Sequence, residues 1–243
     1  MTSRPNFIFI LADDLGSADL GCYGGAGAAY DVSPNIDRMA REGLRFTHAL
    51  ANSPVRSPTR FALLTGCYQY RFRGAAEEPL GSSERGSSVL GSPPSIPTLA
   101  SRLRDAGYRT ALTGKWHLGY APTFGPRKSG YDYFYGATSG AIDYFTHKDS
   151  RGTHDLWENE TEVHEDGYFT DLVSDRAVNW ISGQSAEQPF LLSVHYTAPH
   201  WPWETRDDAA EAARITPRIS HNDGGSLDKY WRMIHHMDEG IGR

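Results

Sequence analysis

Residues 6–14 read Asn-Phe-Ile-Phe-Ile-Leu-Ala-Asp-Asp, an apolar run rich in β-forming side chains that ends abruptly at two carboxylates. A continuous run of this kind predicts a strand buried on both faces, as found inside parallel sheets. Two further strands are predicted at residues 108–113 and 189–196, and polar residues follow both of them. All three predicted strands are therefore followed closely by chemically active side chains.

Helices are predicted between these strands. Ser33 is expected to cap the first, Pro34 fits its first turn, and Gly43 ends it. Similar punctuation predicts helices over residues 95–107 and 170–183. Helices that alternate with apolar strands indicate an α/β fold with a largely parallel central sheet flanked by helices.

Two long stretches, residues 70–94 and 120–166, do not follow this scheme and are rich in Gly, Ser, aromatic and charged residues. Loops of that length in a compact domain are usually functional or disordered. The sequence has no internal repeat and no clear linker. We therefore expect residues 1–243 to belong to a single domain.

Composition excludes several classes of protein. The net charge of −6 gives no nucleic-acid footprint, and no apolar run reaches the length of a membrane span. The apolar run at 7–11 is too short for a secretory signal, so we expect a cytoplasmic location rather than a periplasmic or secreted one. Cys22 and Cys67 cannot form a disulfide framework in a chain of this length.

Polar side chains collect where the predicted strands end: Asp13 and Asp14, Lys115 with His117, and His200. Ligands of open α/β sheets bind beyond the carboxyl ends of the strands. Adjacent carboxylates suit Ca²⁺ or Mg²⁺, and a lysine with two histidines would bind an anionic ester and supply proton donors. Each group alone is equally explained as a turn, cap or surface residue. Their coincidence favours a site for a phosphate or sulfate ester, without choosing between the two.

Residues 52–66 read Asn-Ser-Pro-Val-Arg-Ser-Pro-Thr-Arg-Phe-Ala-Leu-Leu-Thr-Gly, residues 114–117 Gly-Lys-Trp-His, and residues 198–200 Ala-Pro-His. In this order, the three motifs resemble those of the type I sulfatases, a family of the alkaline phosphatase superfamily. Residues 4–14 also resemble the family's first strand with its metal pair, and residues 237–243 resemble the helix before its last metal-binding strand. The resemblance covers essentially the whole chain, as the N-terminal portion of one sulfatase catalytic domain.

The resemblance implies an arylsulfatase-like hydrolase of sulfuric esters, acting on a small-molecule or saccharide sulfate. It also implies a Ca²⁺ ion and a Cys or Ser oxidised to formylglycine by a formylglycine-generating or sulfatase-maturing enzyme. By position, Asp13 and Asp14 would ligate the metal. Lys115 and His200 would bind the sulfate, and His200 would contact it or protonate the leaving oxygen.

The formylglycine position departs from the family pattern, because it is occupied by Arg56. The resemblance implies that Arg60 steadies the modified residue and that His117 lies against its diol. Arginine cannot become an aldehyde by this route, stays protonated in proteins and is no nucleophile. Its charge would also weaken binding of a divalent ion. Ser57 sits one place too late to substitute, so we expect no sulfatase turnover from this chain as it stands.

Cys67 stands where the family commonly has Arg, so Arg and Cys look exchanged between two positions of the motif. It precedes Arg71 with the spacing of a modification motif, but Gln69 replaces the proline. A helical segment would place Cys67 roughly 16 Å from position 56. A half-buried thiol without a role is therefore the favoured interpretation.

Sulfatases are much longer than this chain, and their remaining metal ligands follow the segment that it matches. Two carboxylates alone would make a poor calcium site, since Ca²⁺ takes six to eight oxygens. The central sheet would also lose strands and expose an edge.

Two alternatives to a sulfatase remain open. In the first, the chain is a non-catalytic protein that binds sulfate or a sulfated partner through Arg56, Arg60, Lys115 and His200. In the second, the ester differs, because phosphonate monoester hydrolases and phosphodiesterases of the same superfamily share this framework.

Overall fold

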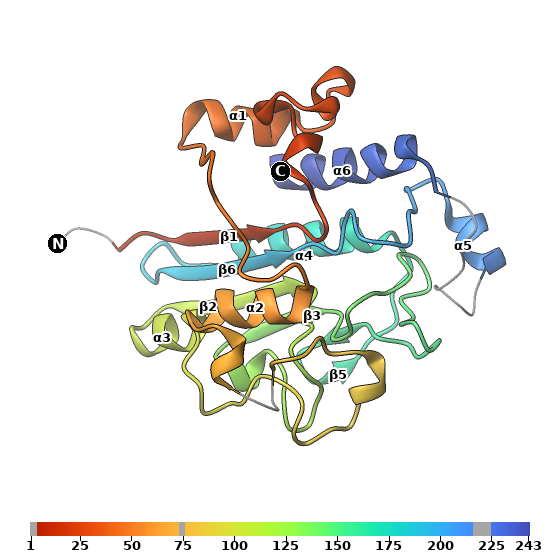
Figure 1. Ribbon diagram of the computed structural model, residues 1–243. Helices are drawn as coiled ribbons and strands as arrows, with labels where there is room; N and C mark the ends of the chain where they lie inside the picture. Colours follow the sequence, from red (N-terminus) through yellow and green to blue (C-terminus); the bar gives the residue numbers. More distant parts are fainter. Residues whose placement is uncertain (1–3, 73–75, 216–224) are drawn as a thin grey trace.

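The computed structural model describes residues 4–72, 76–215 and 225–243, and these residues form a central sheet with helices on both faces (Figure 1). The six strands lie in the order β1-β6-β2-β3-β4-β5. Four of them are mutually parallel, namely β1 (Phe7–Leu11), β6 (Phe190–His195), β2 (Arg109–Gly114) and β3 (Tyr133–Gly136). A short antiparallel hairpin of β4 (Trp157–Glu158) and β5 (Thr161–Glu162) extends the sheet beyond β3. The predicted α/β class with a largely parallel sheet is confirmed.

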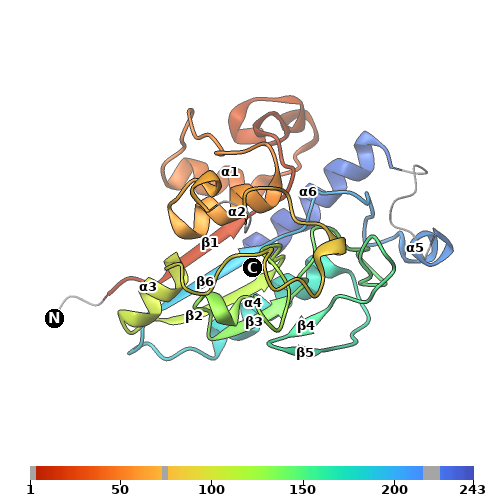
Figure 2. The same cartoon turned by 60° about the horizontal axis from the view of Figure 1, so that its bottom comes forward.

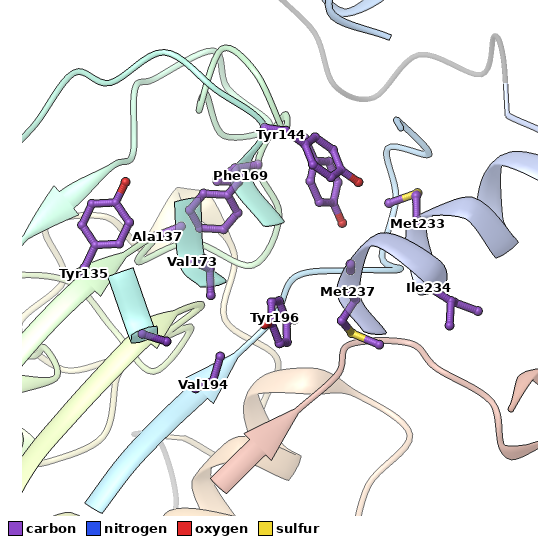
Figure 3. Packing of buried hydrophobic residues seen from close by; sticks show 14 of the residues in the cluster. Tyr135, Ala137, Tyr144, Phe169, Val173, Val194, Tyr196, Met233, Ile234 and Met237 are labelled. Atoms are coloured by element: carbon purple, nitrogen blue, oxygen red, sulfur yellow. The ribbon is translucent and has the colours of Figure 1, made fainter. Parts of the chain in front are cut away.

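Alternate residues of the central strands supply two separate cores, because successive strand side chains point to opposite faces. On one face, Leu112 and Leu191 pack with Phe61 of α2 (Arg56–Thr65) and Ala100 of α3 (Leu99–Asp105). On the other face, the strands pack against α4 (Phe169–Ser182) and α6 (Leu227–Gly242). Figure 3 shows part of this second core, with Val173 of α4 and Met237 of α6 on either side of Tyr196.

The two remaining helices lie outside this arrangement. Helix α1 (Pro34–Glu42) packs against α6, and α5 (Ala209–Ile215) precedes the undescribed segment 216–224. Ser33 occupies the N-cap position of α1 as predicted, but its hydroxyl bonds to Asp37 Oδ1 and accepts from the N–H of Gly21 instead of capping the helix. Helix α3 starts later than predicted, because Thr98 forms its capping box with Ser101.

Strand β1 corrects one prediction. The apolar run at its start was expected to be buried on both faces, but Phe7 is 42% and Ile8 is 53% exposed. In the part of the chain that the structure describes, β1 is an edge strand that pairs with β6 alone. Hydrophobic composition therefore identified the strand but not its place in the sheet.

The stretch 120–166, for which no regular structure was predicted, contains three of the six strands: β3, β4 and β5. Strands of two to four residues are too short for hydrophobic alternation to become visible. Among the described residues, no helix is both long enough and apolar enough to cross a bilayer.

Candidate active site

The carboxyl ends of β1, β6 and β2 lie side by side and carry the candidate site. Leu11 and Gly114 both pair with His195 at the end of β6. Just beyond the strands, the N–H of Lys115 donates to the His195 carbonyl at 2.8 Å, and the N–H of Asp13 donates to the Ala198 carbonyl at 3.1 Å. The register of the parallel strands thus brings the predicted strand-end residues together.

Asp13 lies at the centre of a buried ion network. Its Oδ2 accepts hydrogen bonds from Lys115 Nζ and, at 3.4 Å, from Arg60 Nη2. Arg60 Nη1 also donates to the Lys115 carbonyl at 2.9 Å and lies 3.2 Å from His195 Nδ1, which is itself 3.2 Å from the same carbonyl. All four side chains are almost completely buried. Arg60 therefore joins residues at the ends of three different strands.

Burial and neighbouring charges act in opposite directions on this network. Burial alone would raise the pKa of Asp13, but Lys115 and Arg60 outweigh it and hold that pKa well below its usual range. Complete burial lowers the pKa of Lys115, and the charge of Asp13 offsets this only in part. Burial and the Arg60 charge lower the pKa of His195 to about 3. His195 is therefore neutral at neutral pH, and its Nδ1 accepts from Arg60 in one tautomer and donates to the Lys115 carbonyl in the other.

Helix α2 begins at the site, with Arg56 as its first residue. Arg56 Nη1 lies 4.0 Å from Asp14 Oδ2, and both side chains are partly exposed. The first N–H groups of a helix lack intrahelical partners and favour a bound anion. Ser57 points elsewhere, as its position in the motif predicts, because its buried Oγ accepts from the Leu80 N–H at 2.9 Å.

His200 lies close to the exposed carboxylate of the pair. Its Nδ1 bonds to the Trp201 carbonyl, and its Nε2 lies 3.7 Å from Asp14 Oδ2. A carbonyl can only accept, so Nδ1 carries the proton and Nε2 presents a lone pair. Burial and the Lys115 charge lower the pKa of His200 to about 3. Partial burial and the Asp13 charge raise the pKa of Asp14.

His117 joins the site through Gly140. A Cβ atom on Gly140 would lie 2.5 Å from the His117 ring, and the Gly140 carbonyl accepts from Lys115 Nζ. His117 Nε2 donates to the Leu80 carbonyl at 2.6 Å, which leaves Nδ1 as an acceptor. This Nδ1 is buried without a partner in the described part of the chain. Burial lowers the pKa of His117 well below its usual range.

The structure therefore assembles all seven sequence-predicted side chains around the carboxyl edge of the sheet: Asp13, Asp14, Arg56, Arg60, Lys115, His117 and His200. Sequence reasoning missed His195 and the Gly140 carbonyl. His195 has the same parity as Leu191, which packs toward α2, so strand alternation would have placed it near Arg60. The contribution of Gly140 could not be predicted, because every residue type has a backbone carbonyl.

Cys67 lies away from this cluster. It follows Gly66, which ends α2 in the left-handed conformation, whereas Arg56 is at the opposite end of the helix. Its thiol is free and partly buried, in agreement with the favoured interpretation.

The residues present do not by themselves fit a Ca²⁺ site. Asp13 and Asp14 can offer at most four carboxylate oxygens, and Asp13 Oδ2 already bonds to two cations. Arg56 lies beside the second carboxylate. His200 Nε2 lies 3.7 Å from Asp14, but within the described ranges no third His, Cys, Asp or Glu ligand atom lies within 4.8 Å of both carboxylates at once. Six to eight oxygens are needed around Ca²⁺.

Fold and site together define an α/β protein with a cluster of three cations and two carboxylates at the carboxyl edge of its parallel strands, beside a helix N-terminus. Comparison with known families is more specific. The chain belongs to the sulfatase family, whose model, described as Sulfatase, matches residues 5–243.

Curated relatives support this assignment. The chain is 33% identical to an N-acetylglucosamine-6-O-sulfatase of Bacteroides thetaiotaomicron over 202 residues, which cover 83% of this chain and 32% of the relative. It is 32% identical to arylsulfatase J of Mus musculus over 248 residues, which cover 99% of this chain and 39% of the relative. The chain thus spans less than half the length of these two proteins.

Solved structures give the same result. The crystal structure of Ps i-CgsB in complex with k-i-k-neocarrahexaose is 32% identical, with a TM-score of 0.81, and the match covers 99% of this chain and 54% of that one. The structure of BT4656 in complex with its substrate D-glucosamine-2-N,6-O-disulfate is 30% identical, with a TM-score of 0.65 and coverage of 84% and 36%.

Proposed function

We propose that this site binds the sulfate group of an organic sulfate ester and that Arg56 prevents hydrolysis of the ester by this chain. The observation that carries the proposal is the position of Arg56 as the first residue of α2, 4.0 Å from Asp14, where the family pattern places its nucleophile precursor. The guanidinium occupies the space in which a modified residue would meet the carboxylate pair.

The charge of this cluster supports binding of an anion. Three cations, Arg56, Arg60 and Lys115, face two carboxylates, Asp13 and Asp14, which leaves a net charge of about +1 when all five are ionised. The free N–H groups at the start of α2 add to this field. Sulfate stays anionic at neutral pH, so the positive charge of the cluster favours its binding.

His200 and His117 each present one unprotonated ring nitrogen, Nε2 and Nδ1 respectively. In this state both accept protons or hydrogen bonds and neither donates to an ester oxygen. Because a bound anion favours the charged form of a neighbouring group, a sulfate ester would raise the pKa of His200. His200 is therefore the residue that we propose protonates the leaving oxygen in an active relative.

A sulfated saccharide is the substrate class that the comparisons favour. BT4656 has a doubly sulfated glucosamine as its substrate, and an N-acetylglucosamine-6-O-sulfatase is among the similar curated proteins. The phosphonate or phosphodiester alternative finds no such support. It is tested by comparing turnover of nitrophenyl sulfate and nitrophenyl phosphonate by an Arg56→Cys variant of a full-length sulfatase domain.

Two groups implied by the family belong to this proposal. A divalent cation such as Ca²⁺, when bound beside Asp13 and Asp14, would supply positive charge to the ester oxygens. It would need oxygen ligands other than those described and would compete with Arg56. Formylglycine would require Cys or Ser at position 56 and a maturing enzyme as partner.

Hydrolysis of 4-nitrophenyl sulfate tests the catalytic part of the proposal. The wild-type chain is expected to show no rate above buffer, and mass spectrometry is expected to find no aldehyde at position 56. Arg56→Cys, expressed with a formylglycine-generating enzyme, should acquire the aldehyde mass, whereas Arg56→Ala should not. Measurable turnover by the wild-type chain would refute the proposed block.

Titration calorimetry with inorganic sulfate and an aryl sulfate tests whether the site binds sulfate. The non-catalytic alternative also requires this binding. The wild-type chain should bind both, and Arg56→Ala should weaken binding, because it removes the most exposed of the three cations. No binding heat from protein that unfolds cooperatively would remove the binding proposal while leaving the catalytic block standing.

A further inference from the structure

Three metal-ligating side chains converge beside the β4–β5 hairpin, outside the candidate active site. His154 precedes the hairpin, Glu162 is the last residue of β5, and His164 follows it. Figure 2 shows this hairpin at the edge of the sheet opposite β1. One ligand atom from each residue lies within 4.8 Å of the other two. We propose that these residues form a binding site for a transition-metal ion of the Zn²⁺ type.

The distances match such an ion. His154 Nδ1 lies 2.9 Å and His164 Nε2 lies 3.7 Å from the same oxygen, Glu162 Oε1. Tetrahedral Zn²⁺, with bonds of about 2.0–2.2 Å, places its ligand atoms roughly 3.3–3.6 Å apart. The observed separations fall on either side of that range, so small side-chain rotations are enough to enclose the ion.

The donor atoms favour zinc over the cation implied at the candidate active site. Two imidazoles and one carboxylate form a common zinc ligand set, and the fourth position is left for water. Ca²⁺ and Mg²⁺ prefer oxygen ligands and would gain little from two imidazoles.

The histidine rings are already arranged side by side. The rings of His154 and His164 stack with centroids 4.2 Å apart and an interplanar angle of 26°. The buried ring of His147 packs edge-on against His154, at 6.4 Å and 74°. This contact restricts the orientation of one ligand ring, which lowers the entropy that metal binding must overcome.

An ion at this site would restrain a segment that is hydrogen-bonded to residues of the candidate active site. Asp155, which follows His154, accepts hydrogen bonds from Thr138 Oγ1 at 2.5 Å and from the N–H of Ser139 at 2.7 Å. Gly140, which follows Ser139, accepts a hydrogen bond from Lys115 Nζ through its backbone carbonyl. The proposed ion is thus connected to Lys115 through the hydrogen bonds of Asp155 with residues 138–139 and that of the Gly140 carbonyl.

The test is titration of the wild-type chain and two variants with Zn²⁺ and with Co²⁺ as a spectroscopic probe. We expect one saturable site per chain, a raised Tm, and the visible absorption of tetrahedral Co²⁺. His164→Ala should weaken affinity by at least about tenfold, since even outer-shell partners of metal ligands contribute that much. His235→Ala is the matched control, because the side chain of His235 is 42% exposed and lies 3.6 Å from Glu239, but no third ligand atom joins this pair among the described residues.

The side chain of His164 is 74% exposed, so its removal should leave folding intact, as thermal unfolding without metal would verify. Absence of saturable Zn²⁺ or Co²⁺ binding to the wild-type chain would overturn the proposal. Equal affinities of the wild-type chain and His164→Ala would overturn it too, because binding would then arise at other donors such as the two free thiols. These measurements do not depend on sulfate binding or turnover.

Discussion

Arg60 shows how one side chain can join three strands. Its guanidinium reaches Asp13 after β1, the Lys115 carbonyl after β2, and His195 at the end of β6. Arg56 and Arg60 both point to the carboxylate pair. Helical spacing explains this, because residues i and i+4 lie on the same face of a helix. Arg60 thus has a structural role that does not depend on which residue occupies position 56.

Asp13→Asn should be strongly destabilising. It would leave Lys115 and Arg60 buried without a compensating charge, and breaking a buried pair in this way costs about 3–5 kcal/mol. Urea unfolding would measure the loss. Loss of the Lys115 proton relieves part of the cost, so the destabilisation should be smaller at pH 9 than at pH 6.

The double variant Asp13→Asn/Lys115→Met separates this explanation from simple loss of packing. Removing the buried cation as well should recover part of the lost stability, so the two effects should not add. Additive losses would mean that Lys115 and Asp13 are not coupled.

The strand-end residues of the candidate site could be predicted, because a parallel sheet collects the carboxyl ends of its strands whatever lies between them. Asp13, Lys115 and His200 were found in this way. His195 was missed because it belongs to the strand itself, and Gly140 because its contribution is a carbonyl placed by a loop. Residue type signals side-chain chemistry but not backbone chemistry.

At the scale of elements, two glycines that both have a positive φ angle have different surroundings. Gly66 ends α2 with φ 68°, and a Cβ there would meet nothing within 4 Å. Gly114 ends β2 with φ 103°, and a Cβ there would collide with the carbonyl of His195 on the neighbouring strand. The first glycine serves only a helix end, whereas the second permits β2 and β6 to approach where the site begins.

Gly66→Ala should therefore cost about 1–2 kcal/mol, the penalty of a left-handed residue. Gly114→Ala should cost more than about 4 kcal/mol, because backbone atoms must move in addition. Chemical denaturation of both variants checks the difference. Equal losses would show that the approach of β2 to β6 is not tight.

Strand length decided which elements could be predicted. The five- and six-residue strands β1, β2 and β6 are apolar enough to be recognised, and helices α1 and α4 lie close to their predicted ranges. The shorter β3, β4 and β5 depend on pairing partners for their existence, and a sequence pattern does not show pairing. Because pairing cannot be seen in the sequence, β1 was also wrongly predicted to be buried on both faces.

At the scale of the whole molecule, buried neutral histidines should make stability depend on pH. Burial holds the pKa of His195 and of His200 at about 3, below the value of 6.5 in the unfolded chain. The unfolded state then binds more protons between pH 6.5 and 3. The contribution of these two histidines to stability is complete above pH 6.5 and is lost as pH falls toward 3, by about 1.4 kcal/mol per pH unit for each histidine.

His195→Asn should reduce this slope by the contribution of one histidine, since an amide can accept from Arg60 or donate to the Lys115 carbonyl without titrating. Urea midpoints between pH 4 and pH 6.5 measure the slope. Asp13 contributes in a separate window, because its lowered pKa gives stability that is present above about pH 4 and lost below it. Identical slopes for variant and wild type would contradict burial of a neutral His195.

The exposed edge of β1 predicts self-association of this chain. Among the described residues no strand pairs with its outer side, and an unpaired edge offers N–H and C=O groups to a second molecule. Ile8 on this strand is exposed, and Leu44 and Phe46 form exposed apolar surface in a groove that Ile10 of β1 also lines. Edge and groove together favour a contact that excludes water from both.

Light scattering during size-exclusion chromatography should therefore show a mass that rises with protein concentration. Ile8→Lys should shift the chain toward the monomer, because a charge on an edge strand opposes pairing. Leu227→Lys is the control, since Leu227 is similarly exposed but lies at the start of α6. A monomer at every concentration would contradict the prediction, and so would equal effects of the two lysines, because association would then reflect general hydrophobicity and not the β1 edge.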